Sequence, residues 1–301
     1  MAGIRPLQLR YTRRMMLLWR LACRILLFLT LVTISVAQAP PSNPAFAPLD
    51  QWKDAVIGGN PASLKALYST SPPAQIGTPA GQTNAEADIS FWTGLKVRRM
   101  KLDILHSEAP QTGYRQVVFQ AEIHSGASPQ DRTLYITEGQ LWQRQGAEWR
   151  LMASKRSDPA RLQQPTSTSK VIYAPGIDAR AEIKQALALA AKQHRNLLIV
   201  FGANWCYDCH VLDLAFHRAD VDTVLRRNYE VVHVDVGEGD KNQDLMQQYH
   251  VPMKKGIPAL AVLDSSGKLL YSQQGGEFEK ARALAPEDVL AFLNKWKPIT
   301  R

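Results

Sequence analysis

In the first half of the chain, the hydrophobic positions follow two different periods. Apolar residues recur at helical spacing in three segments and then alternate with polar residues in four later segments. The predicted helices cover residues 49–60, 60–69 and 84–95, and the predicted strands cover residues 96–108, 114–125, 132–145 and 147–157. Helices followed by an antiparallel meander predict an α+β domain.

Turn and capping residues divide these segments. Asn60 is expected to cap the second helix, with Pro61 at its first position. Gln145-Gly146 is the expected turn between the last two strands. Residues 70–82 are rich in Pro, Gly and Thr and are predicted to form a loop.

Strand and helix patterns alternate in the second half of the chain, which predicts an α/β domain. "NLLIVFGA" is a continuous apolar run, typical of a strand buried on both faces. The predicted strands cover residues 170–175, 196–203, 229–236, 258–264 and 268–274, and the predicted helices cover residues 178–195, 211–228, 241–249 and 285–297. No internal repeat is evident.

The N-terminus has the pattern of an export signal. An Arg-rich segment precedes the apolar run "ILLFLTLVTISV", which is followed by small residues, and we expect cleavage after Ala37. "TRRMML" is weakly similar to a twin-arginine signal, so the export route stays open, and an uncleaved anchor is the alternative. We therefore expect an exported protein, periplasmic or secreted. The predicted organisation is a signal peptide (1–37), a proline-rich spacer (38–47), an α+β domain (48–157), a linker (158–170) and a second domain (171–299).

The net charge of +9 belongs mostly to this leader, which carries six arginines and no acidic residue. The remainder of the chain carries only +3 and has no basic stripe with interleaved aromatic residues. We therefore expect no nucleic-acid partner.

The string "CYDCH", Cys206 to His210, fits three chemistries: a redox dithiol, half of a zinc site, or a c-type haem attachment. Cys23 lies in the leader, so one pair remains in a compartment where disulfides persist. A disulfide between Cys206 and Cys209 closes too short a loop to add much stability, which favours redox chemistry. Zinc lacks a fourth ligand with suitable spacing, and the apolar strand entering the motif leaves little room for haem. We expect no metal and no cofactor, and we expect His210 to be a partly exposed helix residue.

The strand, the W-C-x-x-C string opening a helix, and "GIPAL" about 50 residues later resemble the thioredoxin fold over residues 165–299. Trp205, Cys206, Cys209 and Pro258 match the family motif. The resemblance implies that Pro258 is cis and that the backbone of Ile257 lies beside the sulfurs as an edge for an extended substrate. A cysteine at a helix N-terminus is stabilised as a thiolate, so Cys206 is the expected nucleophile and Cys209, one turn later, resolves the mixed disulfide.

Charges near the motif bear on the direction of exchange. Asp208 lies between the cysteines and is expected to raise the pKa of Cys206, which makes the pair more reducing. Lys254 and Lys255 either offset this effect or are simply solvated. The buried acid that thioredoxins carry six residues before the first cysteine is replaced by Val200, with His233 or Asp235 as candidate substitutes.

The first domain, with "WKDAVIGGNPASLKALYS" and "EGQLWQRQGAEWRLMASKRSD", resembles the nuclear transport factor 2-like (SnoaL-like) superfamily. This resemblance implies a curved sheet wrapped around helices as a cone with a pocket. Asp88, Asp103 and His124 are its candidate ionisable residues, with surface or pocket-lining roles expected.

Together these patterns predict an exported thiol–disulfide oxidoreductase that reduces or isomerises protein disulfides and needs an unidentified electron donor. The alternative is a redox-sensing interaction module whose first domain binds a partner or small ligand, or forms a homo-oligomer.

Overall fold

The computed structural model describes residues 46–125 and 132–299 of the chain. The predicted signal peptide and nearly all of the spacer lie outside these residues, so the expectations about export stay predictions. Within the described part, no helix is long and apolar enough to cross a bilayer.

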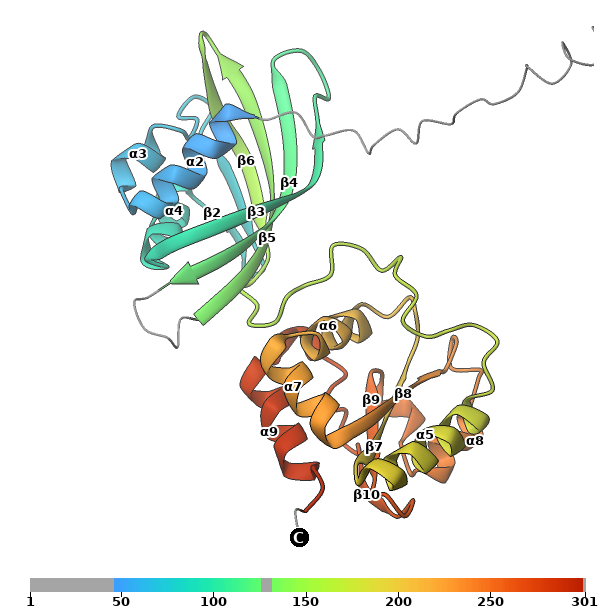
Figure 1. Cartoon of the computed structure of the whole chain (residues 1–301). Coiled ribbons are helices and arrows are strands. Elements are labelled where there is room, and N and C mark those ends of the chain that lie inside the picture. Colours follow the sequence, from blue (N-terminus) through green and yellow to red (C-terminus); the bar gives the residue numbers. More distant parts are fainter. Residues whose placement is uncertain (1–45, 126–131, 300–301) are drawn as a thin grey trace, which may run out of the picture. The chain divides into compact units, whose positions relative to one another are not determined.

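The first domain is a six-stranded sheet in the order β2-β1-β6-β5-β4-β3, with three helices on one face (Figure 1). Its elements are α2 (Ala47–Gly58), α3 (Pro61–Lys65), β1 (Gln75–Thr78), β2 (Gly81–Thr83), α4 (Ala85–Gly94), β3 (Val97–Glu108), β4 (Tyr114–Ser125), β5 (Arg132–Gln145) and β6 (Glu148–Arg156). The predicted meander is confirmed, because β3, β4, β5 and β6 pair antiparallel in sequence order. The Asn60 side chain caps α3, as predicted, by accepting hydrogen bonds from Ala62 N and Ser63 N.

The predicted loop at residues 70–82 was wrong in part, because β1 and most of β2 form there. β1 pairs antiparallel with β2 and parallel with β6. Ile76 is fully buried in β1. The Pro- and Gly-rich composition around it is typical of a loop, so the strand was not predicted. The pairing depends on β6, which is far away in sequence, so local patterning could not reveal it.

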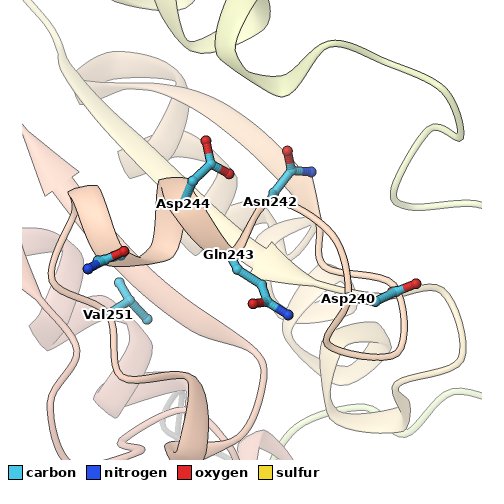
Figure 2. Close-up of a pocket in the computed structure, with 6 residues that line it drawn as sticks. Asp240, Asn242, Gln243, Asp244 and Val251 are labelled. Carbon is cyan, nitrogen blue, oxygen red and sulfur yellow. The ribbon is translucent and has the colours of Figure 1, made fainter.

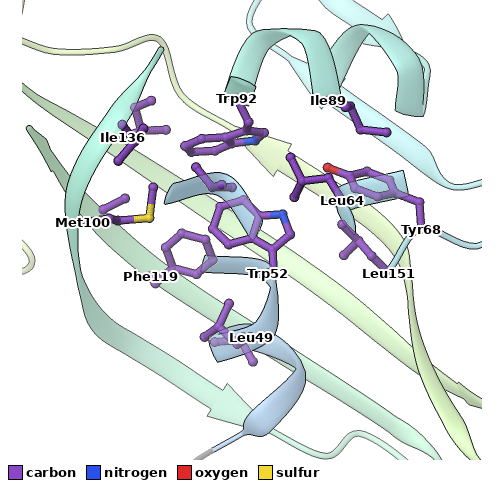
Figure 3. Packing of buried hydrophobic residues seen from close by; sticks show 14 of the residues in the cluster. Leu49, Trp52, Leu64, Tyr68, Ile89, Trp92, Met100, Phe119, Ile136 and Leu151 are labelled. Carbon is purple, nitrogen blue, oxygen red and sulfur yellow. The ribbon is translucent and has the colours of Figure 1, made fainter. Parts of the chain in front are cut away.

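Aromatic side chains fill the space between the helices and the sheet of the first domain (Figure 3). Trp52 from α2 and Trp92 from α4 meet edge to face, with ring centroids 4.8 Å apart, and Phe119 from β4 packs against Trp52. All three side chains are fully buried. The face of the sheet that the helices cover is therefore filled by a packed core at this level.

The core of the first domain also contains a set of hydrogen-bonded polar side chains around Asp88, which is fully buried. The Tyr68 hydroxyl donates to Asp88 Oδ2 over 2.7 Å, and Arg156 Nε donates to Asp88 Oδ1 over 3.2 Å. Buried polar groups of this kind are stable only when they are hydrogen-bonded or paired. Asp103 and His124, by contrast, make local contacts with Lys101 and Glu122.

Glu138 is a second fully buried carboxyl group in the same core. Its Oε1 accepts from Gln140 Nε2 over 2.8 Å, while Oε2 has no partner. Burial, with the charge of Asp88 as the next cause, raises the pKa of Glu138 from 4.5 to about 8. Because this pKa lies above 7, the protonated form of Glu138 dominates at neutral pH.

We expect the stability of the first domain to fall as pH rises. The folded-state pKa of Glu138 is raised, so its contribution is complete below about pH 4.5 and is lost as pH rises through about 8. Thermal melts of the wild type between pH 5 and 9 should show the midpoint falling by about 5 °C or more. Glu138→Gln removes the titration and should flatten this dependence; an equally steep dependence in the variant would contradict the assignment.

The second domain is a four-stranded sheet in the order β10-β9-β7-β8, covered by helices on both faces (Figure 1). Its elements are α5 (Ala179–Gln193), β7 (Asn196–Gly202), α6 (Tyr207–Phe216), α7 (Ala219–Asn228), β8 (Tyr229–Asp235), α8 (Gln243–Gln248), η1 (Met253–Lys255), β9 (Ala259–Leu263), β10 (Leu269–Ser272), η2 (Ala281–Ala283) and α9 (Pro286–Trp296). β7 pairs parallel with β8 and antiparallel with β9.

The apolar run of β7 is buried along its whole length, as its pattern predicted. Leu198 and Val200 pack with α6, α7 and α9 on one face of the sheet. Leu197, Ile199 and Phe201 pack with α5 and α8 on the other face. Side chains of a strand alternate between faces, so a strand covered on both sides must be apolar at every position.

Two sequence-based expectations for this domain were wrong. Residues 170–175 form no strand. The Asn204 side chain, and not a neighbouring strand, bonds the backbone of residues 172 and 173. The predicted helix 211–228 is two helices, because the apolar positions of α6 end at Phe216 and resume out of phase at Val221. A break at His217 and Arg218 lets both helices turn their apolar faces to the same core.

Candidate functional site: the Cys206–Cys209 pair at the start of α6

The two cysteines lie at the N-terminus of α6 and form a disulfide, with their Cα atoms 5.3 Å apart. Cys206 is the N-cap residue, and its Sγ accepts a hydrogen bond from Cys209 N over 3.1 Å. Unpaired N–H groups and the positive end of the helix dipole stabilise negative charge at this position. After reduction, the same geometry favours Cys206 as a thiolate.

The backbone of Ile257 lies beside the first sulfur. Cys206 Sγ is 3.7 Å from Ile257 O, and the Ile257 side chain packs against the two cysteines. The peptide bond between Ile257 and Pro258 is cis, which confirms the sequence-based prediction. The residues predicted to form a substrate edge therefore lie next to the sulfur of Cys206.

Trp205 forms an exposed apolar rim before the first cysteine. Its side chain is 55% exposed, although its Nε1 donates to Gly237 O over 3.0 Å. This hydrogen bond holds the exposed ring next to Cys206, where it offers an apolar contact surface. Cys206 and Cys209 themselves are 4% and 2% exposed.

Asp208 does not face the cysteines as a free charge. Its carboxylate forms an ion pair with the guanidinium of Arg282 in η2 and accepts the Arg282 backbone N–H over 2.9 Å. The guanidinium also lies 4.8 Å from the centre of the Tyr207 ring. The paired charge acts more weakly on Cys206 than we expected from the sequence, where nothing near the motif signals Arg282.

His210 is buried, so the prediction of a partly exposed residue was wrong. It is 2% exposed, and its Nε2 lies 2.7 Å from Asn204 O. This contact aims the imidazole at the backbone before the motif, which stabilises the turn into α6. Within the described ranges, no three His, Cys, Asp or Glu side chains are placed to hold a metal ion.

Tyr173 is a site residue that the sequence did not reveal. It is 1% exposed and belongs to the same small buried cluster as the two cysteines. The Asn204 side chain holds its backbone, because Oδ1 accepts from Ile172 N and Tyr173 N, and Nδ2 donates to Tyr173 O. The only local signal was an aromatic residue in a segment that was assigned to a strand.

The candidate substitutes for the missing acid lie on β8. Val200 pairs in register with His233, which is largely buried and meets the Tyr173 ring edge to face at 5.5 Å. Burial lowers the pKa of His233 below its ordinary value. Asp235 is engaged elsewhere, because it accepts from Gly237 N and Lys241 Nζ. Lys254 and Lys255 are exposed.

A surface hollow lies beside α8, apart from the residues that contact the sulfurs (Figure 2). Its walls are acidic and amide side chains: Asp240, Asn242, Gln243, Asp244 and Gln247, together with Val251. Nothing in this lining matches the chemistry of the cysteine pair.

The fold and the cysteine pair define a thioredoxin-like domain, and residues 178–265 match the model of the thioredoxin-like family. These residues belong to that family, and the first domain has the nuclear transport factor 2-like fold. No match was found among the curated proteins.

Solved structures resemble each half of the chain. A disulphide isomerase from Xylella fastidiosa Temecula1 is 38% identical, covering 42% of this chain and 97% of the other, with a TM-score of 0.41. A nuclear transport factor 2-like protein of unknown function from Rhodospirillum rubrum is 21% identical, covering 37% of this chain and 94% of the other (TM-score 0.32). A similar protein from Cytophaga hutchinsonii is 15% identical, covering 37% and 92% (TM-score 0.32).

Proposed function

We propose that the protein is a thiol–disulfide oxidoreductase that reduces or isomerises disulfides of other proteins. One observation carries this proposal: a redox-capable cysteine pair caps a helix with its first sulfur beside the Ile257 backbone. The helix N-terminus supplies thiolate stabilisation, and Trp205 with Ile257 supplies an apolar rim for a polypeptide.

The reaction proceeds in two exchanges. The Cys206 thiolate attacks one sulfur of a substrate disulfide, forms a mixed disulfide and releases the other substrate sulfur as a thiolate. Cys209 then attacks Cys206 Sγ, which releases the substrate's second sulfur and forms the Cys206–Cys209 disulfide. In isomerisation, a thiolate of a different substrate cysteine attacks the substrate sulfur of the mixed disulfide before Cys209 reacts, which forms a new substrate disulfide and releases the Cys206 thiolate.

The reducing or isomerising direction rests on the balance of charge around Cys206. The Asp208 charge disfavours an isolated thiolate, and pairing with Arg282 weakens this effect without removing it. A less stabilised thiolate makes a dithiol a stronger reductant. Continuous reduction requires an electron donor that reduces the Cys206–Cys209 disulfide after each turnover. The export pattern of the leader supports an exchange outside the cytoplasm.

Insulin reduction tests the proposed function. The chain lacking residues 1–37 is incubated with insulin and dithiothreitol, and precipitation of the freed insulin B chain is followed by turbidity. We expect clear acceleration by the wild type and none by Cys206→Ser, because the nucleophile is lost. Equal rates with wild type, with Cys206→Ser and with dithiothreitol alone would remove the enzymatic claim.

A further inference from the structure

The exchange mechanism leaves open how Cys209 becomes nucleophilic inside the domain. Cys209 is 2% exposed, and burial in apolar surroundings disfavours a thiolate. Val200 provides no acid or base at the position where thioredoxins carry one. A buried polar group on the side of this sulfur is therefore a candidate for the missing role.

The Tyr173 hydroxyl occupies the place next to Cys209. A Cβ atom added to Gly202 would overlap this hydroxyl and lie only 2.8 Å from Cys209 Sγ. The missing side chain of Gly202, at the end of β7, therefore leaves the space that the hydroxyl occupies on the side of the sulfur. The three hydrogen bonds between Asn204 and the backbone of residues 172 and 173 keep the ring there.

We propose that Tyr173 is the positioning residue of the resolving step: its hydroxyl donates a hydrogen bond to Cys209 Sγ and stabilises this sulfur as a thiolate. This inference rests on the proposed function. The Tyr173 hydroxyl is a donor at every physiological pH, because burial, followed by the charges of Asp213 and Asp235, raises its pKa above the ordinary value. A hydrogen bond donated to an ionised sulfur is stronger than one to a neutral thiol, so it favours the reacting form.

The ionisable groups around Tyr173 come from two elements, β8 and α6. His233 meets its ring from β8, Asp235 lies at the end of the same strand, and Asp213 belongs to α6. Asp213 is paired with Lys170 at 2.5 Å. The lowered pKa of His233 keeps it neutral at pH 7, so it adds no competing positive charge beside the sulfur.

The step balances without a further reactant. The mixed disulfide Cys206–S–S–R and the Cys209 thiol give the Cys206–Cys209 disulfide and R–SH. The bond between Cys209 Sγ and Cys206 Sγ forms while the bond to the substrate sulfur breaks, and the proton lost by Cys209 ends on the released thiol. Tyr173 keeps its own proton throughout.

Single-turnover exchange with oxidised glutathione separates the attack by Cys209, in which we place Tyr173, from the first attack by Cys206. Reduced protein is mixed with excess oxidised glutathione and quenched in acid, and mass spectrometry counts the glutathionylated intermediate and the intramolecular disulfide. Tyr173→Phe should slow resolution about tenfold at pH 7, the size expected for losing one hydrogen bond to a charged group. The pH midpoint of resolution should rise by about one unit, while alkylation of Cys206 by iodoacetamide stays within twofold.

Tyr229→Phe is the matched control. Tyr229 is also buried in this domain, and its hydroxyl donates to Leu293 O over 2.6 Å, away from the cysteines. It should resolve the intermediate at the wild-type rate. If the wild type itself never converts the intermediate, the proposed function fails; if Tyr173→Phe resolves like the wild type, only the role of Tyr173 fails.

A measurement on the wild-type protein tests the same inference if Tyr173→Phe does not fold. Wild-type protein is labelled with ¹³C at tyrosine Cζ, and the Tyr173 signal is assigned through its contacts with the Cys209 β-protons. We expect this signal to move when the disulfide is reduced at a pH where Cys209 ionises. An unchanged signal through reduction and titration would overturn the inference.

Discussion

Cys209→Ser is expected to convert the protein into a trap for its substrates. Cys206 keeps its place at the start of α6 and still attacks a disulfide, but no second sulfur lies within reach to release the product. The mixed disulfide should then resolve at least about a thousandfold more slowly than in the wild type, the scale of losing a reacting group. Non-reducing electrophoresis and mass spectrometry with a disulfide-linked peptide measure the adduct.

Two related variants test which of the two cysteines attacks the substrate first. Cys206→Ser should form little adduct, because Cys209 is more deeply buried and lacks the N-cap position. The double variant should form none and reports background labelling. Equal adduct on Cys209 in the Cys206→Ser protein would mean that the nucleophile has been assigned to the wrong cysteine.

The second large effect is expected for Gly202→Ala. An added Cβ would lie 2.5 Å from Tyr173 Cζ and 2.8 Å from Cys209 Sγ, and would overlap the Tyr173 hydroxyl. The Asn204 side chain fixes the backbone of Tyr173, and Cys209 is part of α6. Neither residue can therefore move away from the added Cβ without a large cost in free energy. We expect a loss of about 3 kcal/mol in the free energy of unfolding of this domain, at the upper end for overpacking.

Denaturant titration followed by hydrogen exchange at the backbone amides of β7 measures this loss in the second domain. Gly275→Ala is the matched control, because its Cβ would make only an ordinary contact, 3.6 Å from Glu277 Cδ, in the same domain. It should change the unfolding midpoint little. A Gly202→Ala protein as stable as the wild type would show that Tyr173 is free to move from the sulfurs.

Much of the site could be predicted because its signals are local. The spacing of Cys206 and Cys209 places both sulfurs at one helix start, and the uninterrupted apolar run before them requires a strand covered on both faces. Pro258 completed the motif through family resemblance, and its cis bond is present. Each of these features depends on residues that are neighbours in sequence or match a known pattern.

The environment of the sulfurs could not be predicted in the same way. Arg282 pairs with Asp208 from 74 residues away, and Tyr173 is clamped by Asn204 from 31 residues away. His210 appeared to be a polar helix residue until the turn containing Asn204 covered it. The first domain shows the same limit, because β1 joins the large sheet by pairing with β6, which lies far away in sequence.

By itself, the sequence determined the order of the two domains, most of their helices and strands, and the cysteine pair, because periodicity and short motifs act over a few residues. Only the tertiary structure decided which charge Asp208 meets, how deeply Glu138 is buried, and which hydroxyl faces Cys209. Burial, ion pairing and hydrogen bonding between distant segments depend on where the packed chain places them, and no local pattern encodes those distances.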